Sequence, residues 1–206
     1  MSAAREYGLD EDYEWARPPA EGWTADDLDR LPNLPPHTEL IDGSLVFVSP
    51  QTEFHMFTLR LFENSLLDQA PVEFEVFREF TVKLDKRNRP EPDILVIRAG
   101  ADTGPRRTCV KPEDLVLAVE IVSEDSEDRD RKVKPWKYAN AGIRHYWRVE
   151  ENNGSPVVYV YELDPATSKY VPTGVHHDRL KVGEPFLIDI DLTAGNRRRR
   201  MTAESN

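Results

Sequence analysis

The sequence predicts a mixed α/β domain in which helices cover a β-sheet. Two short, nearly continuous apolar runs lie mid-chain, DILVIR at 93–98 and LVLAVEIVS at 115–123, and such runs are typical of central strands buried on both faces. Apolar residues at helical spacing follow one stripe of 52–69. Strand-like and helix-like segments alternate along 206 residues, which is the length of one domain with tails.

The first elements are marked by capping and turn residues. Thr24 is a suitable N-cap for a short helix over 25–31, and prolines follow that helix and end it. Asp42-Gly43 stands between two apolar runs, so a β-hairpin is expected there. The helix over 52–69 comes next.

The later elements follow from alternation and apolar runs. Residues 72–84 predict a strand with an irregularity near Arg78, and 99–114 predict a loop between the two central strands. The charge run 124–132 predicts a solvated loop or a helix start, and Pro135–Ala141 a helix closed by Gly142. Further strands are expected at 145–150, 156–163, 169–173 and 185–190.

Three units are expected along the chain: a flexible N-terminal lead at 1–23, the folded domain at 24–192, and an Arg-rich C-terminal tail at 193–206. The run Arg197–Arg200 fits either a solvated tail or a contact with nucleic-acid phosphates.

Composition excludes several classes of protein. The net charge of −11 argues against a protein that coats nucleic acid by bulk electrostatics. The single cysteine, Cys109, excludes a disulfide framework and a CxxC zinc site. No stretch has the roughly 18–20 apolar residues of a membrane helix, and the acidic N-terminus lacks the order of a secretory signal. A cytoplasmic protein that does not contact membranes is therefore expected.

Two carboxylates interrupt the apolar central strands. Asp93 opens the first run, and Glu120 lies inside the second, beside the small Ala118 on the same face. A buried carboxylate must be protonated, paired or bound to a cation, because burying it alone costs several kcal/mol. Glu120 could pair with a basic residue across the sheet, and Asp93 could be a turn residue. Two carboxylates that converge from neighbouring strands would also form the oxygen-rich site that Mg²⁺ prefers.

Four segments carry a family resemblance that spans most of the chain. They are ELIDG (39–43), EPDILVI (91–97), LAVEIVS (117–123) and DRKVKPWKYANAGIRHYW (130–147). In order and spacing they resemble the Uma-two family of restriction endonucleases, which belongs to the PD-(D/E)xK nuclease superfamily. The resemblance implies a restriction-endonuclease-like fold, a mixed β-sheet core flanked by α-helices.

The resemblance also implies roles for individual residues. Asp93 and Glu120 match the metal-binding carboxylates, with Mg²⁺ or Mn²⁺ as the cofactor, and Glu39 matches an acid that completes the metal shell. Lys134 matches the catalytic lysine, since the superfamily position two residues after the glutamate holds Val122 here. Such a lysine orients the attacking water, helps to deprotonate it and stabilises charge on the phosphoryl group.

The lysine assignment depends on the start of a helix. Pro135 directly follows Lys134, and proline fits only the first turn of an α-helix, so Lys134 is expected at the helix start. Lys132 and Lys137 are the alternatives. Tyr138 would share a helix face with Lys134.

Other side chains have two interpretations. His55 either contacts phosphate or water, or is a packed, hydrogen-bonded core residue. Arg129 and Arg131 lie where they could face a phosphate. Three aromatic residues could stack on bases, but residues at such spacings more often belong to a core: Trp136, Tyr146 and Trp147.

The sequence thus predicts a Mg²⁺-dependent endonuclease that hydrolyses DNA phosphodiester bonds through a metal-activated water. A homodimer is expected, because two symmetry-related sites are the simplest way to cut both strands of a duplex. The alternatives are a catalytically silent binding or scaffold protein with a nuclease fold, and a nuclease for RNA or branched DNA.

Overall fold

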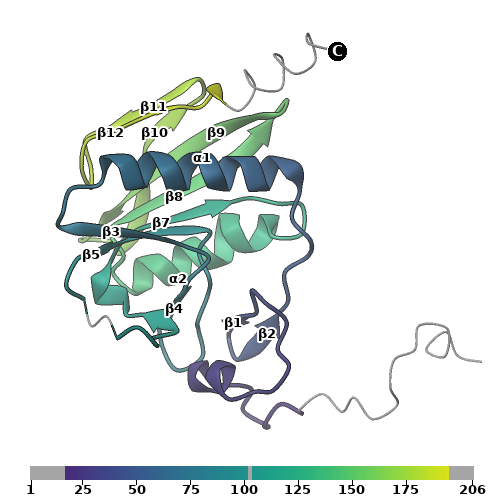
Figure 1. Ribbon diagram of the computed structural model, residues 1–206. Helices are drawn as coiled ribbons and strands as arrows, with labels where there is room; N and C mark the ends of the chain where they lie inside the picture. The colour runs from purple at the N-terminus through teal and green to yellow at the C-terminus, as the bar shows by residue number, and fades with distance from the viewer. Residues whose placement is uncertain (1–16, 102–103, 195–206) are drawn as a thin grey trace, which may run out of the picture.

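A six-stranded mixed sheet forms the centre of the computed structural model, which describes residues 17–101 and 104–194 (Figure 1). The strand order is β10-β9-β8-β7-β5-β3. Only β7 and β8 run parallel, and the other neighbouring pairs are antiparallel. The strands are β3 (Phe74–Arg78), β5 (Ile94–Arg98), β7 (Leu115–Ile121), β8 (His145–Asn152), β9 (Ser155–Asp164) and β10 (Lys169–His176).

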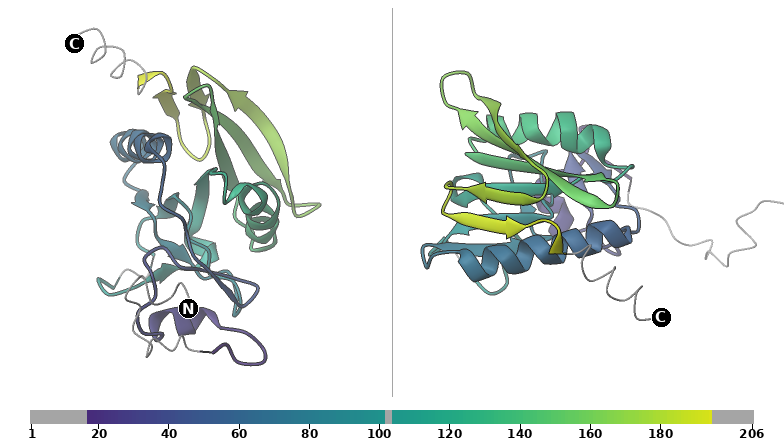
Figure 2. Two further views of the ribbon diagram at one scale, coloured as in Figure 1. Left: turned by 90° about the vertical axis from the view of Figure 1, so that its right-hand side faces the viewer. Right: turned by 90° about the horizontal axis from the view of Figure 1, so that it is seen from above.

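Two helices cover opposite faces of this sheet (Figure 2). Helix α1 (Glu53–Gln69) is capped at its N-terminus by Thr52, whose hydroxyl accepts a 3.2 Å hydrogen bond from the His55 backbone N–H. Its buried stripe packs on one face, which the hairpin of β11 (Arg179–Val182) and β12 (Ile188–Asp191) completes. The smaller core on the other face includes Tyr138 of helix α2 (Lys134–Asn140). The predicted class, a mixed sheet flanked by helices, is confirmed.

Short elements complete the fold around the sheet. In the predicted hairpin, Asp42 and Gly43 form the turn with φ angles of 51° and 78°. The predicted helix over 25–31 is only a short 3-10 helix. The short elements are η2 (Ala25–Asp29), β1 (Glu39–Ile41), β2 (Ser44–Val46), β4 (Thr81–Val82), β6 (Cys109–Val110) and η3 (Pro112–Asp114).

The predicted strand over 72–84 is divided in two. β3 ends at Arg78, and Glu79 adopts a left-handed φ of 48°, which turns the chain out of the sheet. The following β4 pairs in parallel with β6. β6 lies within 99–114, the segment that was expected to be a loop. A register shift lies between Val96 and Ile97, where they pair with β7. Beside it, Leu115 joins the core on the α2 face, whereas Leu117 joins the core on the α1 face.

The charge run 124–132 is only partly solvated, because a π-helical turn, η4 (Arg129–Val133), leads directly into α2. The Lys134 N–H donates to the carbonyl of Arg129, one residue further back than in an α-helix. This wider turn accommodates Pro135, which has no N–H and would clash with a carbonyl four residues earlier. Lys134 begins α2 as predicted. Of the two alternatives for the charge run, the helix start is found, and Asp130 within it is only 2% exposed.

The two ends of the chain and the aromatic residues differ in how far the structure describes them. Residues 1–16 of the lead and 195–206 of the tail, with the arginine run, lie outside the described residues. Tyr146 and Trp147 belong to the core, whereas Trp136 is 64% exposed. Within 17–101 and 104–194, no helix is long and apolar enough to cross a membrane.

Candidate active site

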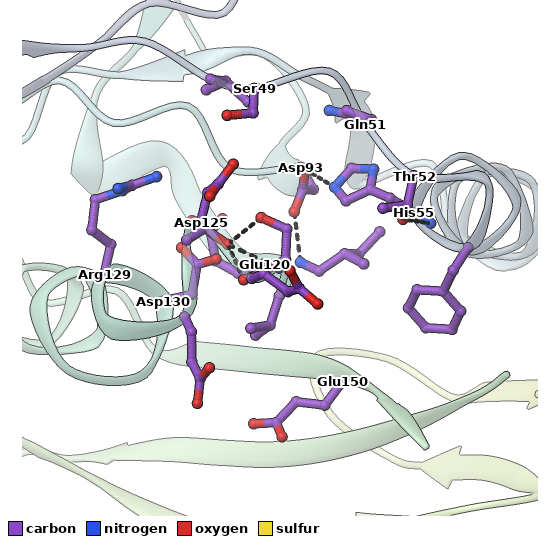
Figure 3. Close-up of a pocket in the computed structure, with 18 of the residues that line it drawn as sticks. Ser49, Gln51, Thr52, His55, Asp93, Glu120, Asp125, Arg129, Asp130 and Glu150 are labelled. Atoms are coloured by element: carbon purple, nitrogen blue, oxygen red, sulfur yellow. Dashed lines mark hydrogen bonds and ion pairs between the residues drawn. The ribbon is translucent and has the colours of Figure 1, made fainter. Parts of the chain in front are cut away.

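The carboxylates of Asp93 and Glu120 line one pocket of about 590 Å³. β5 and β7 are antiparallel, and Ile94 faces Val119, so the residue before β5 lies beside the end of β7. Asp93 and Glu120 are therefore neighbours at one end of the sheet, and both line the pocket. Figure 3 shows His55 of α1 next to Asp93, near Glu120. Arg129 projects from the η4 turn on the other side of the pocket.

A lysine ammonium holds three buried carboxylates together. Lys134 Nζ lies 2.9 Å from Glu39 Oε1, 2.9 Å from Glu120 Oε2 and 3.3 Å from Asp130 Oδ1. All four side chains are at most 6% exposed. The acids come from β1, β7 and the η4 turn, so a single ammonium joins three parts of the fold.

The charge state of this cluster follows from burial and from its neighbours. Burial raises the pKa of Glu120 well above its usual range, and the ammonium of Lys134 opposes this rise. Burial likewise raises the pKa of Asp130, again opposed by Lys134. Burial alone would lower the pKa of Lys134, but the charges of the surrounding carboxylates raise it well above its usual range. The lysine is therefore an ammonium at neutral pH.

Tyr138 fixes the second oxygen of Glu120. Its hydroxyl donates a 2.6 Å hydrogen bond to Glu120 Oε1, and its side chain is fully buried. Burial raises the pKa of Tyr138 well above its usual range, so the hydroxyl keeps its proton. Lys134 and Tyr138, one helical turn apart, thus hold the two oxygens of one carboxylate.

Asp93 is held by a separate pair of contacts. The backbone N–H of Ile121 donates to Asp93 Oδ2 at 2.6 Å, and His55 Nε2 lies 2.9 Å from Asp93 Oδ1. His55 is 5% exposed, and among the described residues its buried Nδ1 has no hydrogen-bond partner. The histidine is thus buried and hydrogen-bonded, and it lines the pocket beside Asp93.

One basic side chain in the pocket has no carboxylate partner. Within the described chain, Arg129 forms no ion pair, and its Nε is buried without a hydrogen-bond partner. The other basic residues that line the pocket each lie within ion-pair distance of an acid: His37, His55, Arg131 and Lys134. The guanidinium of Arg129 is therefore available to an anion.

The alternative lysines lie outside the pocket lining. Lys132 is exposed and pairs with Asp128 at 2.7 Å. Lys137 is buried and pairs with Asp42 at 2.6 Å, at the turn of the first hairpin. Of the three lysines, only Lys134 contacts the carboxylates that the sequence singled out.

Asp130 is the acid that sequence reasoning missed. It stood in a run of charges typical of a solvated loop. The available signal was its spacing from Lys134, since residues four apart in a helix share one face. The π-helical turn that buries Asp130 gives no recognisable pattern in a single sequence.

The donor set fits a hard divalent cation. Four carboxylates act on one ammonium, and carboxylate oxygens are the ligands that Mg²⁺ and Mn²⁺ prefer. In the part of the chain that the structure describes, no three His, Cys, Asp or Glu side chains already form a metal-binding group. Their oxygens instead contact Lys134, Tyr138, His55 and backbone amides. The chemistry fits, and a cation would compete with Lys134 for the acids.

The comparisons with known proteins agree with this fold. The sequence profile of the Uma2 family, described as "Putative restriction endonuclease", matches residues 25–195, so the chain belongs to that family. A solved structure of "a putative nuclease belonging to DUF820" from Anabaena variabilis ATCC 29413 is similar with a TM-score of 0.53. It is 16% identical, and the match covers 79% of this chain and 89% of that chain. No curated protein matches the sequence. Family and fold together support a nuclease with a nucleic acid substrate.

Removing the ammonium should destabilise the protein more than neutralising one acid. Lys134→Met leaves three buried carboxylates without their cation, and we expect a loss of about 3–5 kcal/mol in the free energy of unfolding. Glu120→Gln removes a buried charge and can still accept from Tyr138, so a cost of less than about 1 kcal/mol is expected. Urea denaturation in EDTA at pH 7 measures both. A Lys134→Met variant as stable as wild type would contradict the charged cluster.

Proposed function

We propose that this protein is a metal-dependent endonuclease that hydrolyses DNA phosphodiester bonds through an activated water. The observation that carries the proposal is the convergence of Asp93, Glu120, Glu39 and Lys134 in one open pocket. Family membership supports a nuclease, and the donor set supports the metal. The choice of DNA rests on the description of the family.

The proposed ligands of Mg²⁺ or Mn²⁺ are Asp93, Glu120 and Glu39. When bound, such an ion polarises a phosphate oxygen and lowers the pKa of a coordinated water. The chain supplies the fixed positions of the ligands. His55 and the amide of Ile121 hold Asp93, and Tyr138 holds Glu120. These two carboxylates are therefore oriented before a metal or substrate binds.

Lys134 and Arg129 have different proposed roles toward the substrate. The carboxylates hold Lys134 as an ammonium, which can donate to the attacking water and stabilise negative charge on the phosphoryl group. Arg129 has no acid partner in the described chain, so its planar guanidinium can bind phosphate oxygens of the DNA backbone. The acidic pocket would otherwise repel a polyanion.

A catalytically silent binding or scaffold protein is the second candidate. It is favoured by the ion pairs of Lys134, which already satisfy Glu39 and Glu120. A nuclease for RNA or branched DNA would need the same site chemistry. The expected homodimer stays a prediction.

Cleavage of supercoiled plasmid with Mg²⁺, Mn²⁺ or EDTA tests the proposal. We expect metal-dependent cutting that Glu120→Gln and Asp93→Asn each reduce by at least about 10²–10³-fold, because each removes a charged ligand. Lys134→Met should reduce cutting similarly where the variant remains folded. Lys132→Ala is the matched control, since that lysine is exposed and pairs outside the pocket.

Parallel reactions with single-stranded DNA, RNA and branched DNA separate the candidates. Cutting of RNA alone would replace the substrate and keep the site. If every substrate remained intact and neither Mg²⁺ nor Mn²⁺ stabilised the wild type against heat, the silent scaffold would be the better account.

Arg129→Gln should weaken substrate binding more than it slows the chemical step. One lost phosphate contact predicts a KM raised by about 10-fold, and a salt dependence of DNA binding reduced by about one counterion. Arg98→Gln is the control, because Arg98 is exposed at the other end of β5 and outside the pocket lining. Equal KM values and salt slopes in wild type and Arg129→Gln would exclude the contact.

A further inference from the structure

A second, smaller pocket of about 270 Å³ lies where α2 meets β8, β9 and β10. Aromatic and basic side chains make up most of its lining, and no Asp or Glu among the described residues lines it. Those that matter here are Trp136, Tyr161, Tyr170, Arg131, Arg148 and Lys169.

The charge of this pocket differs from that of the rest of the molecule. The chain carries a net charge of −11, and eleven carboxylates line the pocket of Asp93 and Glu120. In the second pocket, Arg131 pairs with Glu127 and Glu150, and Arg148 pairs with Glu150 on β8. The exposed Lys169 has no carboxylate partner in the described chain. An ammonium that is free of acids thus lies beside an acidic site, where it can attract a phosphate.

The aromatic residues form a platform with an exposed edge. Tyr146 stacks on Tyr170 with ring centroids 5.5 Å apart and lies 5.8 Å from the ring of Tyr161. The guanidinium of Arg148 lies 5.6 Å from the centroid of Tyr161. Trp136 lines the same pocket and is 64% exposed, unlike the buried Trp147. A large exposed indole beside basic side chains is an arrangement on which nucleobases stack.

The two pockets are adjacent in the fold. Arg131 lines both of them. At the start of α2, Lys134 contacts Glu39, Glu120 and Asp130, the acid cluster of the first pocket. The next two residues, Pro135 and Trp136, line the second pocket. A strand bound at the first pocket could therefore extend past Arg131 into the second pocket.

We propose that the second pocket binds an unpaired nucleotide of the DNA strand held at the acid cluster. Its base stacks on Trp136, and its phosphate contacts Lys169. This inference rests on the proposed nuclease function and specifies the substrate: DNA with a single-stranded segment next to the scissile bond.

Binding of a fluorescein-labelled 15-nucleotide thymidine oligomer, measured by anisotropy with Ca²⁺ present, tests the inference. Loss of one base–aromatic stack predicts that Trp136→Ala weakens binding by about 5- to 150-fold. Trp136→Phe keeps an aromatic face and should stay within about 3-fold of wild type. Lys169→Ala should weaken binding and reduce the salt slope by about 0.7. Matched controls are Phe57→Ala and Lys181→Ala, exposed side chains outside both pockets.

A direct signal comes from Trp136 itself. Oligomer binding should quench the indole fluorescence of wild type, and the Trp136→Phe variant should lose that quench. Because Trp136 is exposed, its variants should keep the melting temperature of wild type within about 2 °C. If wild type cuts plasmid but wild type and Trp136→Ala bind the oligomer with equal affinity, the nucleotide site at Trp136 is refuted and the proposed nuclease function is kept.

Two further outcomes would also overturn it. An equal loss of affinity for duplex DNA would show that the nucleotide need not be unpaired, and tighter binding of the matching RNA oligomer would reject DNA. Wild type that neither cuts nor binds any nucleic acid would refute the proposed function as well. The plasmid assay thus separates the two failures.

Discussion

The triple ion pair of Lys134 is the interaction on which the rest of the site depends. Three buried carboxylates from separate parts of the chain would repel one another and lose their hydration, and a single ammonium offsets both costs. The same contacts connect the first hairpin, the central sheet and the start of α2. The candidate site and the packing of these elements therefore share one electrostatic centre.

The fold brings these groups together through register and local helix geometry. The antiparallel register of β5 and β7 makes Asp93 and Glu120 neighbours. The π-helical turn before α2 accommodates Pro135 and directs Asp130 and Lys134 toward the sheet. Beyond that turn, α2 presents the exposed Trp136 to a pocket lined by aromatic and basic side chains, so one short segment contributes to two neighbouring surfaces.

Sequence patterns predicted the parts of the fold that depend on local signals. Apolar runs gave the central strands, and Asp42-Gly43 gave the hairpin, because a positive φ is required there. The division of the strand over 72–84 depends on tertiary contacts, and the π-helical turn at Asp130 depends on backbone geometry, so neither was predictable from sequence patterns. Glu120 stood out because a charge in an apolar strand needs a partner, whereas the identity of that partner required coordinates.

A divalent cation bound at this site would compete with Lys134 for the carboxylates. Anomalous diffraction from a crystal soaked in Mn²⁺ would test this most directly. We expect an anomalous peak about 2.0–2.2 Å from oxygens of Asp93 and Glu120, with Lys134 Nζ moved away from Glu120. A pocket without a peak at saturating Mn²⁺, in which Lys134 still contacts Glu39 and Glu120, would contradict the account.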